Sequence, residues 1–384
     1  MKTFISSLEH RINQKINIDS ILVKRLLADQ FPQFKDLPVR QVYPGGWDNR
    51  TFHLGNDMLV RMPSAEKYAA QVEKEQKWLP ILAPLLPFSI PKPLAMGNPS
   101  EYYPWKWSIY RWLEGKTAAS TQKLDLCHFA TDLSKFLIAL QSVNSKDGPL
   151  PGTHNFHRGG DIKVYDSQTR KALSILSNKI DVKPATKIWE EALHTTWKSP
   201  PVWVHGDLSA NNLLVKSGKL SSIIDFGMLG VGDPACDLAI TWTFFEGESR
   251  EVFKSMLPYD DSTWARGRAW TLWKALIVGS GLASANAGDV EHSWQVIDHI
   301  LAEYNVKNFN KQIVKTRLEE RNELEETKLE KQKSNTNNCG SESKENFINY
   351  LTDSKLKKDT VPTPLEDKVL SGETNSSMHT EDID

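Results

Sequence analysis

The sequence predicts an α+β fold in two lobes, a small β-rich lobe followed by a larger, mainly helical one. Short apolar segments separated by glycine-containing turns occupy residues 1–113, with one long helical segment among them. Helical apolar spacing dominates residues 114–308. A charged segment, 309–333, and a polar segment, 334–384, follow. We therefore expect a nucleotide-binding lobe, a helical catalytic lobe, a charged helix and a tail.

The first lobe begins with a predicted helix. Asp19 precedes apolar residues at the spacing of one helix face, and Pro32 stops the pattern. A second, longer helix is expected to begin at Ser64 and to end at Pro80 and Pro84. Runs of apolar and β-branched residues predict strands at 37–42, 51–54, 58–62, 91–95 and 107–112.

The second lobe has the pattern of helices around two short strands, 202–204 and 222–224, which flank a loop. Helices are expected at 124–143, 161–177, 184–197, 237–245, 262–282 and 290–304. The leucines of 309–333 keep no heptad, which favours a solvated single helix over a coiled coil. Residues 334–384 are expected to be disordered, because they cannot bury enough apolar surface to offset their ordering entropy.

Composition narrows the function classes. Lys and Arg number 47 and Asp and Glu number 48, so the net charge of -1 gives no global field for nucleic acid or an anionic membrane. The cysteines, Cys127, Cys236 and Cys339, are far apart, which argues against a disulfide scaffold or a zinc site. No secretory signal is apparent. The longest stretch of small and apolar residues, 275–287, is shorter than the ~20 residues of a membrane span. We expect a cytoplasmic protein with no nucleic-acid or membrane partner.

The strongest chemical signal surrounds the two short strands of the second lobe. Asp207 is followed five residues later by Asn212, and thirteen residues after that Asp225 begins an Asp-Phe-Gly sequence. Kinase-type phosphoryl transfer uses this layout of base and metal ligands. Mg²⁺ prefers oxygen ligands, and a hydroxyl nucleophile needs a carboxylate to orient it. Asp207 is thus the expected base, with Asn212 and Asp225 as Mg²⁺ ligands, although each alone is typical of a turn.

Together these segments resemble the aminoglycoside phosphotransferase family of the protein-kinase-like superfamily. The resemblance covers residues 35–305 and rests on His-Gly-Asp at 205–207 with Asn212, Asp-Phe-Gly at 225–227, and Gly-Asp-Pro-Ala-Cys-Asp-Leu-Ala at 232–239. It implies a bilobal kinase-like fold, Mg²⁺, ATP as co-substrate and a small hydroxylated acceptor. It also implies that Asp233 and Asp237 are structural, with Asp233 before Pro234 as a helix N-cap.

The resemblance gives the beginning of the chain a role in nucleotide binding. Gly45 and Gly46 would form the turn that covers the phosphates, because backbone without a Cβ can approach them closely. Trp47, Asp48 and Asn49 would lie at the tip of this loop, and Asn49 is included among the expected nucleotide contacts. A plain turn is the alternative reading.

Three further positions complete the expected nucleotide site. Arg61 occupies the strand position where protein kinases carry lysine, and a guanidinium can hold phosphate through two hydrogen bonds. Glu75 is the expected helix partner of Arg61, with Glu73 as the competitor. Adenine would meet backbone groups near Tyr110 and Trp112. The alternative for Arg61 is an exposed strand residue, and the alternative for both glutamates is a solvated helix face. The aromatic side chains of the adenine segment would otherwise belong to the core.

The acceptor site is not identified by the sequence. An aminoglycoside is polycationic and would need several carboxylates, and the candidates are Glu246, Glu248, Glu251, Asp260, Asp261 and Glu291. Their alternative is a set of solvated surface charges. Trp270 and Trp273 would either stack on an acceptor or belong to the core. The polar loop 154–160 would either cover the acceptor or form an ordinary turn.

The sequence therefore predicts an Mg-ATP-dependent kinase of a small molecule. Aminoglycosides, macrolides, choline, homoserine and methylthioribose are all acceptors that this kind of fold accommodates, and fold alone does not choose among them. The alternative class is a kinase-fold scaffold with weak or no catalysis, which recruits a protein partner through its charged helix and tail.

Overall fold

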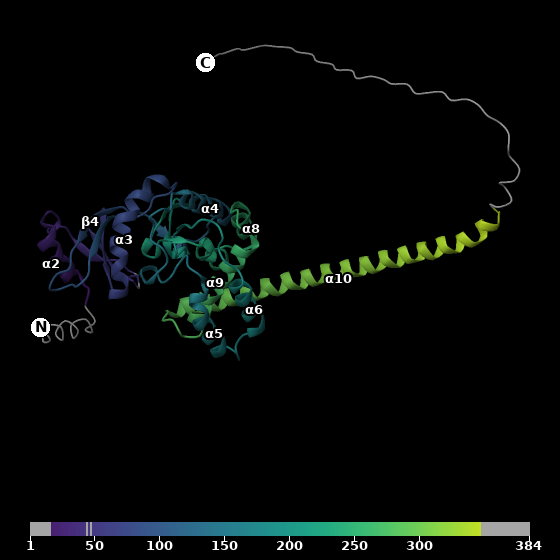
Figure 1. The fold of residues 1–384 in the computed structure, drawn as a ribbon. Helices are drawn as coiled ribbons and strands as arrows, with labels where there is room; N and C mark the ends of the chain where they lie inside the picture. Colours follow the sequence, from purple (N-terminus) through teal and green to yellow (C-terminus); the bar gives the residue numbers. More distant parts are fainter. Residues whose placement is uncertain (1–16, 44, 47, 347–384) are drawn as a thin grey trace, which may run out of the picture. The chain divides into compact units, whose positions relative to one another are not determined.

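The computed structural model describes residues 17–43, 45–46 and 48–346. The chain divides into two compact units, Met1–Asn310 and Lys311–Asp384. Both predicted lobes belong to the first unit, so the expected boundary at 113/114 separates two lobes of one unit (Figure 1). The expected disorder of 347–384 and the position of Trp47 lie outside the described residues.

The first lobe contains a five-stranded antiparallel sheet in the order β1-β2-β3-β5-β4. Its strands are β1 (Val39–Gln41), β2 (Asn49–Leu54), β3 (Met58–Pro63), β4 (Pro93–Gly97) and β5 (Trp107–Arg111). All five strands of this lobe were expected, and their bounds differ from prediction by a few residues. The β2–β3 hairpin turns at Gly55, whose φ of 63° lies in the left-handed region that glycine adopts without strain.

Two helices cover opposite faces of this sheet. Side chains alternate along a strand, so Val60 of β3 packs with α2 (Ser20–Gln30), whereas Arg61 faces α3 (Glu66–Leu82). Asp19 caps α2 as expected, accepting hydrogen bonds from the amides of Ile21 and Leu22. The α3 face of the sheet thereby brings charged side chains toward the second lobe.

Helix α3 differs from prediction at both ends. Ala65, not Ser64, is its N-cap, and the amide of Ser64 donates to the carbonyl of Asp48 instead. Pro80 lies inside the helix, which continues to Leu82. The side chains of Leu79 and Leu82 are fully buried, and their burial offsets the hydrogen bond that a proline cannot donate.

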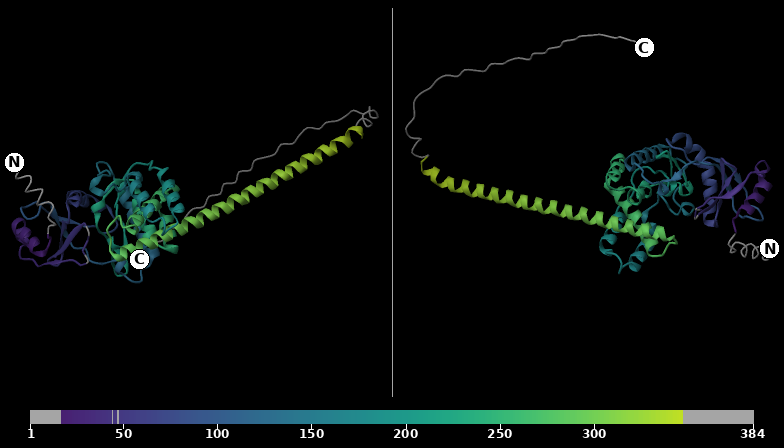
Figure 2. Two further views of the ribbon diagram at one scale, coloured as in Figure 1. Left: turned by 90° about the horizontal axis from the view of Figure 1, so that it is seen from below. Right: turned by 180° about the vertical axis from the view of Figure 1, so that it is seen from behind.

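The second lobe is mainly helical (Figure 2). Its helices are α4 (Leu126–Ser142), α5 (Asp166–Ile175), α6 (Val182–Leu193), α7 (Ile240–Thr243), α8 (Gly247–Met256), α9 (Asp261–Gly279) and the first part of α10 (Ala287–Asn346). Helix α8 was not predicted. The helix expected at 237–245 is a 3₁₀ turn, Pro234–Ala239, followed by the short α7, because Asp233 caps the turn and Asp237 is drawn inward.

Short strands frame the segments that carry the kinase-like motifs. β7 (Val202–Val204) pairs with β10 (Gly230–Gly232), and β8 (Leu213–Lys216) pairs with β6 (Lys116–Thr117) and β9 (Lys219–Ile223). β6, β8 and β10 span two to four residues, which is too short for a clear periodic signal. The loop after β7 and the loop after β9 lie next to each other because β8 pairs with β9.

Helix α10 extends further than the sequence suggests. The charged helix expected at 309–333 continues directly from the helix before it and runs to Asn346, thirteen residues beyond the expected end. Residues 334–346 are therefore helical rather than disordered. Propagating an existing helix costs much less than nucleating one, so weak helix formers can join it. Among the helices described, none combines the length and apolarity that crossing a membrane requires.

These elements confirm the expected fold class. A β-rich lobe with one long helix precedes a larger, mainly helical lobe, as in the bilobal protein-kinase-like fold. The core is continuous between the lobes, since Trp78 and Tyr110 of the first lobe pack in the same buried cluster as Trp203 and Phe226 of the second.

One glycine of the sheet has no space for a side chain, which gives a stability prediction. A Cβ on Gly97 would lie 2.0 Å from Cε2 of the fully buried Trp107. Gly97→Ala should lower the free energy of unfolding by roughly 1–3 kcal/mol or more, because the indole must shift within a packed core. Urea unfolding followed by tryptophan fluorescence measures the change.

The control is Gly45→Ala, since a Cβ there would lie at an ordinary 3.8 Å from its nearest neighbour, the carbonyl of Val42. Equal stability of the Gly97 and Gly45 variants would contradict the packing described for β4.

Candidate active site

The loop after β7 is held by a buried carboxylate. Asp237 accepts hydrogen bonds from the amides of His205, at 2.8 Å, and Gly206, at 2.7 Å. His205 is fully buried, donates from Nε2 to the carbonyl of Ile224 and accepts at Nδ1 from the amide of Asp207. Burial raises the pKa of Asp237, while His205 and the two amides oppose that rise. The structural role expected for Asp237 is therefore seen directly.

Gly206 can only be glycine in this geometry. Its φ is 84°, and a Cβ would lie 2.5 Å from the carbonyl oxygen of Met228. The chain thus carries His-Gly-Asp here because the loop runs against the segment that follows Asp-Phe-Gly.

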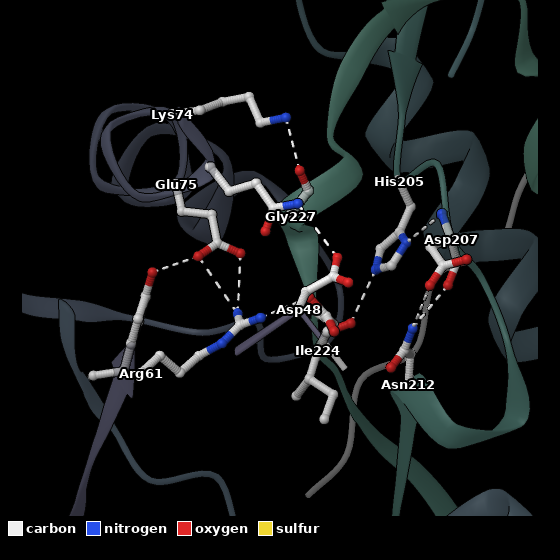
Figure 3. Close-up of polar contacts among 12 residues, drawn as sticks. Asp48, Arg61, Lys74, Glu75, His205, Asp207, Asn212, Ile224 and Gly227 are labelled. Carbon is white, nitrogen blue, oxygen red and sulfur yellow. Dashed lines mark hydrogen bonds and ion pairs between the residues drawn. The ribbon is translucent and has the colours of Figure 1, made fainter. Parts of the chain in front are cut away.

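The structure places Asn212 in direct contact with Asp207 (Figure 3), and Asp225 follows Ile224, whose backbone binds Asn212. Asn212 donates from Nδ2 to the backbone oxygen of Asp207 at 2.8 Å. The backbone carbonyl of Asn212 accepts from the amide of Ile224 at 2.9 Å. Asp225 follows directly. The side-chain amide of Asn212 is thereby oriented by its donor end, which leaves Oδ1 as the atom that could bind a metal ion.

Asp225 has an uncommon backbone conformation. Its φ of 66° is left-handed, an uncommon backbone for a non-glycine residue. Its side chain is 40% exposed, and one carboxylate oxygen accepts from Arg61 at 2.7 Å. One amide oxygen and one carboxylate fit Mg²⁺, which takes few protein ligands together with phosphates and water. Within 17–346, apart from 44 and 47, no three His, Cys, Asp or Glu side chains form a metal cluster.

Arg61 of the first lobe binds one carboxylate from each lobe. Its Nη1 donates to Glu75 at 3.1 Å and its Nη2 to Asp225 at 2.7 Å. The pairing with Glu75 is confirmed, because Glu73 instead forms an ion pair with Lys106. Burial by itself would lower the pKa of Arg61, but Glu75 and Asp225 raise it overall. The guanidinium is therefore charged and is held between the carboxylates of Glu75 and Asp225.

The expected adenine contacts need correction. Tyr110 lies inside the sheet, paired with Leu59 on one side and Pro93 on the other, and its buried hydroxyl donates to Glu75. The amide of Trp112 donates to the carbonyl of Asp57, so it is not a free donor for a purine. Backbone groups inside a sheet form hydrogen bonds with the neighbouring strands, and the sequence pattern could not show which strands those are.

The glycine turn is only partly as expected. Gly45 and Gly46 are exposed in the loop before β2. Asn49, expected at the tip of the loop, is instead the buried first residue of β2, opposite Pro63. Asp48 is the residue that turns toward the site, held by Gln71 at 3.4 Å. Burial and the nearby charge of Asp225 raise the pKa of Asp48.

Two lysines near the site were not predicted from the sequence, and Arg158, from the predicted polar loop 154–160, lies beside the same loop as Asp207. Lys274 of α9 donates to Oδ1 of Asp207 at 2.7 Å. Arg158 donates from Nε to the carbonyl of Gly206 at 3.1 Å. Lys74 of α3 donates to the carbonyl of Gly227 at 2.8 Å. Helical spacing identifies α3 and α9 but carries no signal for which lysine crosses to another element.

Lys274 controls the charge of the expected base. Burial would raise the pKa of Asp207, but Lys274 and Arg158 lower it to about 2. Asp207 is therefore ionised at any pH at which the protein is expected to work. A carboxylate with such a low pKa is a weak base, so it orients a hydroxyl and does not remove the proton early in the reaction. This behaviour suits the loose transition state of phosphoryl transfer.

The other acceptor-site candidates are mostly structural. Trp270 and Trp273 are 5% and 4% exposed and belong to the core, and Trp273 stacks on Tyr165. The loop 154–160 is anchored, since the carbonyl of Gly159 accepts from the amide of Asp233. Asp233 is the expected N-cap before Pro234 and also forms an ion pair with Arg266.

Comparison with known proteins agrees with this geometry. A model of the phosphotransferase enzyme family matches residues 39–270. An aminoglycoside 3'-phosphotransferase of Escherichia coli is 40% identical over 63 residues, or 16% of this chain and 23% of that protein. One from Salmonella typhimurium is 42% identical over 60 residues, or 15% of this chain and 22% of that protein. The match thus spans less than a quarter of the length of these relatives.

Solved structures share the fold. The complex of APH(2")-IIia with GDP and kanamycin aligns with a TM-score of 0.58 at 16% identity, over 74% of this chain and 99% of that chain. The macrolide 2'-phosphotransferase MphH of Brachybacterium faecium aligns with a TM-score of 0.50 at 20% identity, over 72% and 97%. At these identities the likeness shows a common fold.

Buried Lys74 gives a prediction about pH. Burial lowers the pKa of Lys74 to about 7, from an ordinary value of 10.5. Between these pH values the unfolded chain binds the proton that the folded protein has lost, so the free energy of unfolding should rise with pH. The rise in the wild type should exceed about 1.4 kcal/mol, the free energy of a tenfold change in proton affinity. Lys74→Met should remove this rise.

The measurement is denaturant unfolding of wild type and Lys74→Met from pH 6 to pH 10, taken as the difference between the two curves. The difference should be flat below about pH 7 and increase above it. Two parallel curves across the whole range would show that Lys74 keeps an ordinary proton affinity.

Proposed function

This chain belongs to the phosphotransferase enzyme family, and on that premise we propose that it transfers the γ-phosphoryl group of ATP to a hydroxyl of a small molecule, with Mg²⁺ as the metal. The observation that carries the proposal is the convergence of Asp207, Asn212 and Asp225 opposite Arg61. Base, metal-binding oxygens and a phosphate-binding cation are the parts that such a reaction needs.

In the proposed reaction, the acceptor oxygen forms a bond to the γ-phosphorus, and the bond from that phosphorus to the β–γ bridging oxygen breaks, which releases ADP. Asp207 accepts a hydrogen bond from the acceptor hydroxyl, orients it and takes its proton as the new bond forms. Arg61, held by Glu75 and Asp225, places positive charge beside the phosphates.

The side-chain oxygens of Asn212 and Asp225 would hold Mg²⁺, which when bound neutralises charge on the phosphate oxygens. Most of the catalysis is then positioning and electrostatic stabilisation, because the protein forms no covalent bond to the phosphoryl group. The similar proteins described above are phosphotransferases of aminoglycosides and macrolides, and they support a hydroxylated acceptor without identifying it.

Removing the charge of the base tests the proposal. Asp207→Asn should lower turnover by roughly 100-fold or more, because an amide cannot accept the proton, while ATP binding persists. Phosphate transfer from ATP is followed as ADP release in the presence of hydroxylated acceptors. Asp298→Asn, at an exposed carboxylate of the same lobe, is the control. Near-normal turnover of Asp207→Asn would refute the role of Asp207.

The metal role of Asp225 is tested by nucleotide binding. Asp225→Ala should weaken binding of Mg-ATP at least tenfold, while binding of ATP in the presence of a chelator changes little. Calorimetric titration with and without Mg²⁺ separates the two. Unchanged affinity for Mg-ATP would remove Asp225 from the metal site.

A further inference from the structure

The oxygen of Asp207 that faces away from Asn212 is occupied by a lysine. Nζ of Lys274 lies 2.7 Å from Oδ1 of Asp207, whereas Oδ2 lies 3.5 Å from Nδ2 of Asn212. The side chain of Lys274 is 44% exposed and that of Asp207 is 30% exposed. A hydroxyl that binds Asp207 on the side opposite the metal ligands must therefore lie beside an accessible ammonium group.

A second cation reinforces the positive charge on this side. The guanidinium of buried Arg158 donates to the carbonyl of Gly206, the residue before Asp207. Arg158 and Lys274 lie 4.7 Å and 5.7 Å from the centroid of the same ring, Trp270. The surroundings of the base on the α9 side are thus cationic and aromatic.

Asp260 and Glu251, two of the carboxylates that a polycationic acceptor would need, have partners elsewhere. Asp260 and Asp261 begin α9, thirteen or more residues before Lys274, a separation of about 20 Å along a helix. Asp260 caps the helix at Thr263, and Glu251 pairs with Lys254. Among the described residues, no hydrogen bond or ion pair joins any of the six acidic candidates to Asp207 or Lys274.

Resting on the proposed phosphotransferase function, we propose that the acceptor is a small hydroxylated carboxylate rather than a polycation. Its carboxylate would bind Lys274 while its hydroxyl binds Asp207. Lys274 would then exchange the carboxylate of Asp207 for that of the acceptor, and the acceptor hydroxyl would donate a hydrogen bond to Asp207 in its place. An acceptor with ammonium groups at this position would instead meet the like charges of Lys274 and Arg158.

The first experiment compares acceptors that share a carbon skeleton. Wild-type protein with Mg-ATP is offered glycerate, threonate and gluconate, the matched alcohols glycerol, threitol and sorbitol, and kanamycin as the polycation. We expect at least one acid to show a kcat/KM ten or more times that of its alcohol, with its phosphate ester identified by mass spectrometry. Preference for an alcohol or for kanamycin, or no transfer to any of the three acids, would overturn the proposal.

The second experiment changes the lysine. Lys274→Met should raise the KM of the preferred acid at least tenfold and leave the KM of ATP within twofold, whereas Lys274→Arg should retain the preference for the acid. Lys171→Met, at an exposed lysine of α5, is the matched control. An equal loss of kcat for every acceptor and for hydrolysis of ATP by water would assign Lys274 to the phosphoryl group, and the acceptor proposal would be wrong.

Binding of Mg-ATP distinguishes failure of this inference from failure of the proposed function. If wild type binds Mg-ATP and hydrolyses it slowly but prefers no acid, only the acceptor class is wrong. If wild type does not bind Mg-ATP, the phosphotransferase function is wrong and the acceptor proposal is wrong with it. Fluorescence unfolding of each variant confirms that a changed KM does not come from loss of the fold.

Discussion

The active-site arrangement depends on one buried cation, the guanidinium of Arg61. It extends from the central part of the first sheet and binds Glu75 on α3 and Asp225 after β9. Arg61 and Glu75 are largely withdrawn from water, so leaving either unpaired would cost far more than a surface ion pair gains. This pairing makes the orientation of α3, the sheet and the Asp-Phe-Gly segment mutually dependent.

A second network fixes the catalytic loop from the other side. Asp237 holds the amides of His205 and Gly206, and His205 reaches the carbonyl of Ile224. The loop that carries Asp207 and the segment that carries Asp225 are therefore connected by hydrogen bonds from two buried side chains, Asp237 and His205, to backbone groups. Rigid support of this kind keeps the reacting groups in place before a substrate arrives, which is where most catalysis by positioning originates.

Much of this could be predicted, because the motifs are local. Asp207, Asn212 and Asp225 are close in the sequence and lie on either side of one β-hairpin, so their spacing alone indicates their convergence. Asp19 and Asp233 act as caps over a few residues, and the strands of the first lobe follow from short runs of apolar and β-branched residues. Asn49 was misplaced because the end of a loop depends on strand pairing, and only the structure shows that the amide of Trp112 is used by the carbonyl of Asp57.

By itself, the sequence determined the order of lobes, the family and the residues of the phosphoryl-transfer motif, since each rests on short-range spacing. Only the tertiary structure decided which cations meet those residues. Lys274 is 67 residues from Asp207 and Arg61 is 164 residues from Asp225. Such contacts depend on how helices and strands pack in three dimensions, and charge in one segment carries no information about the partner that packing will bring to it.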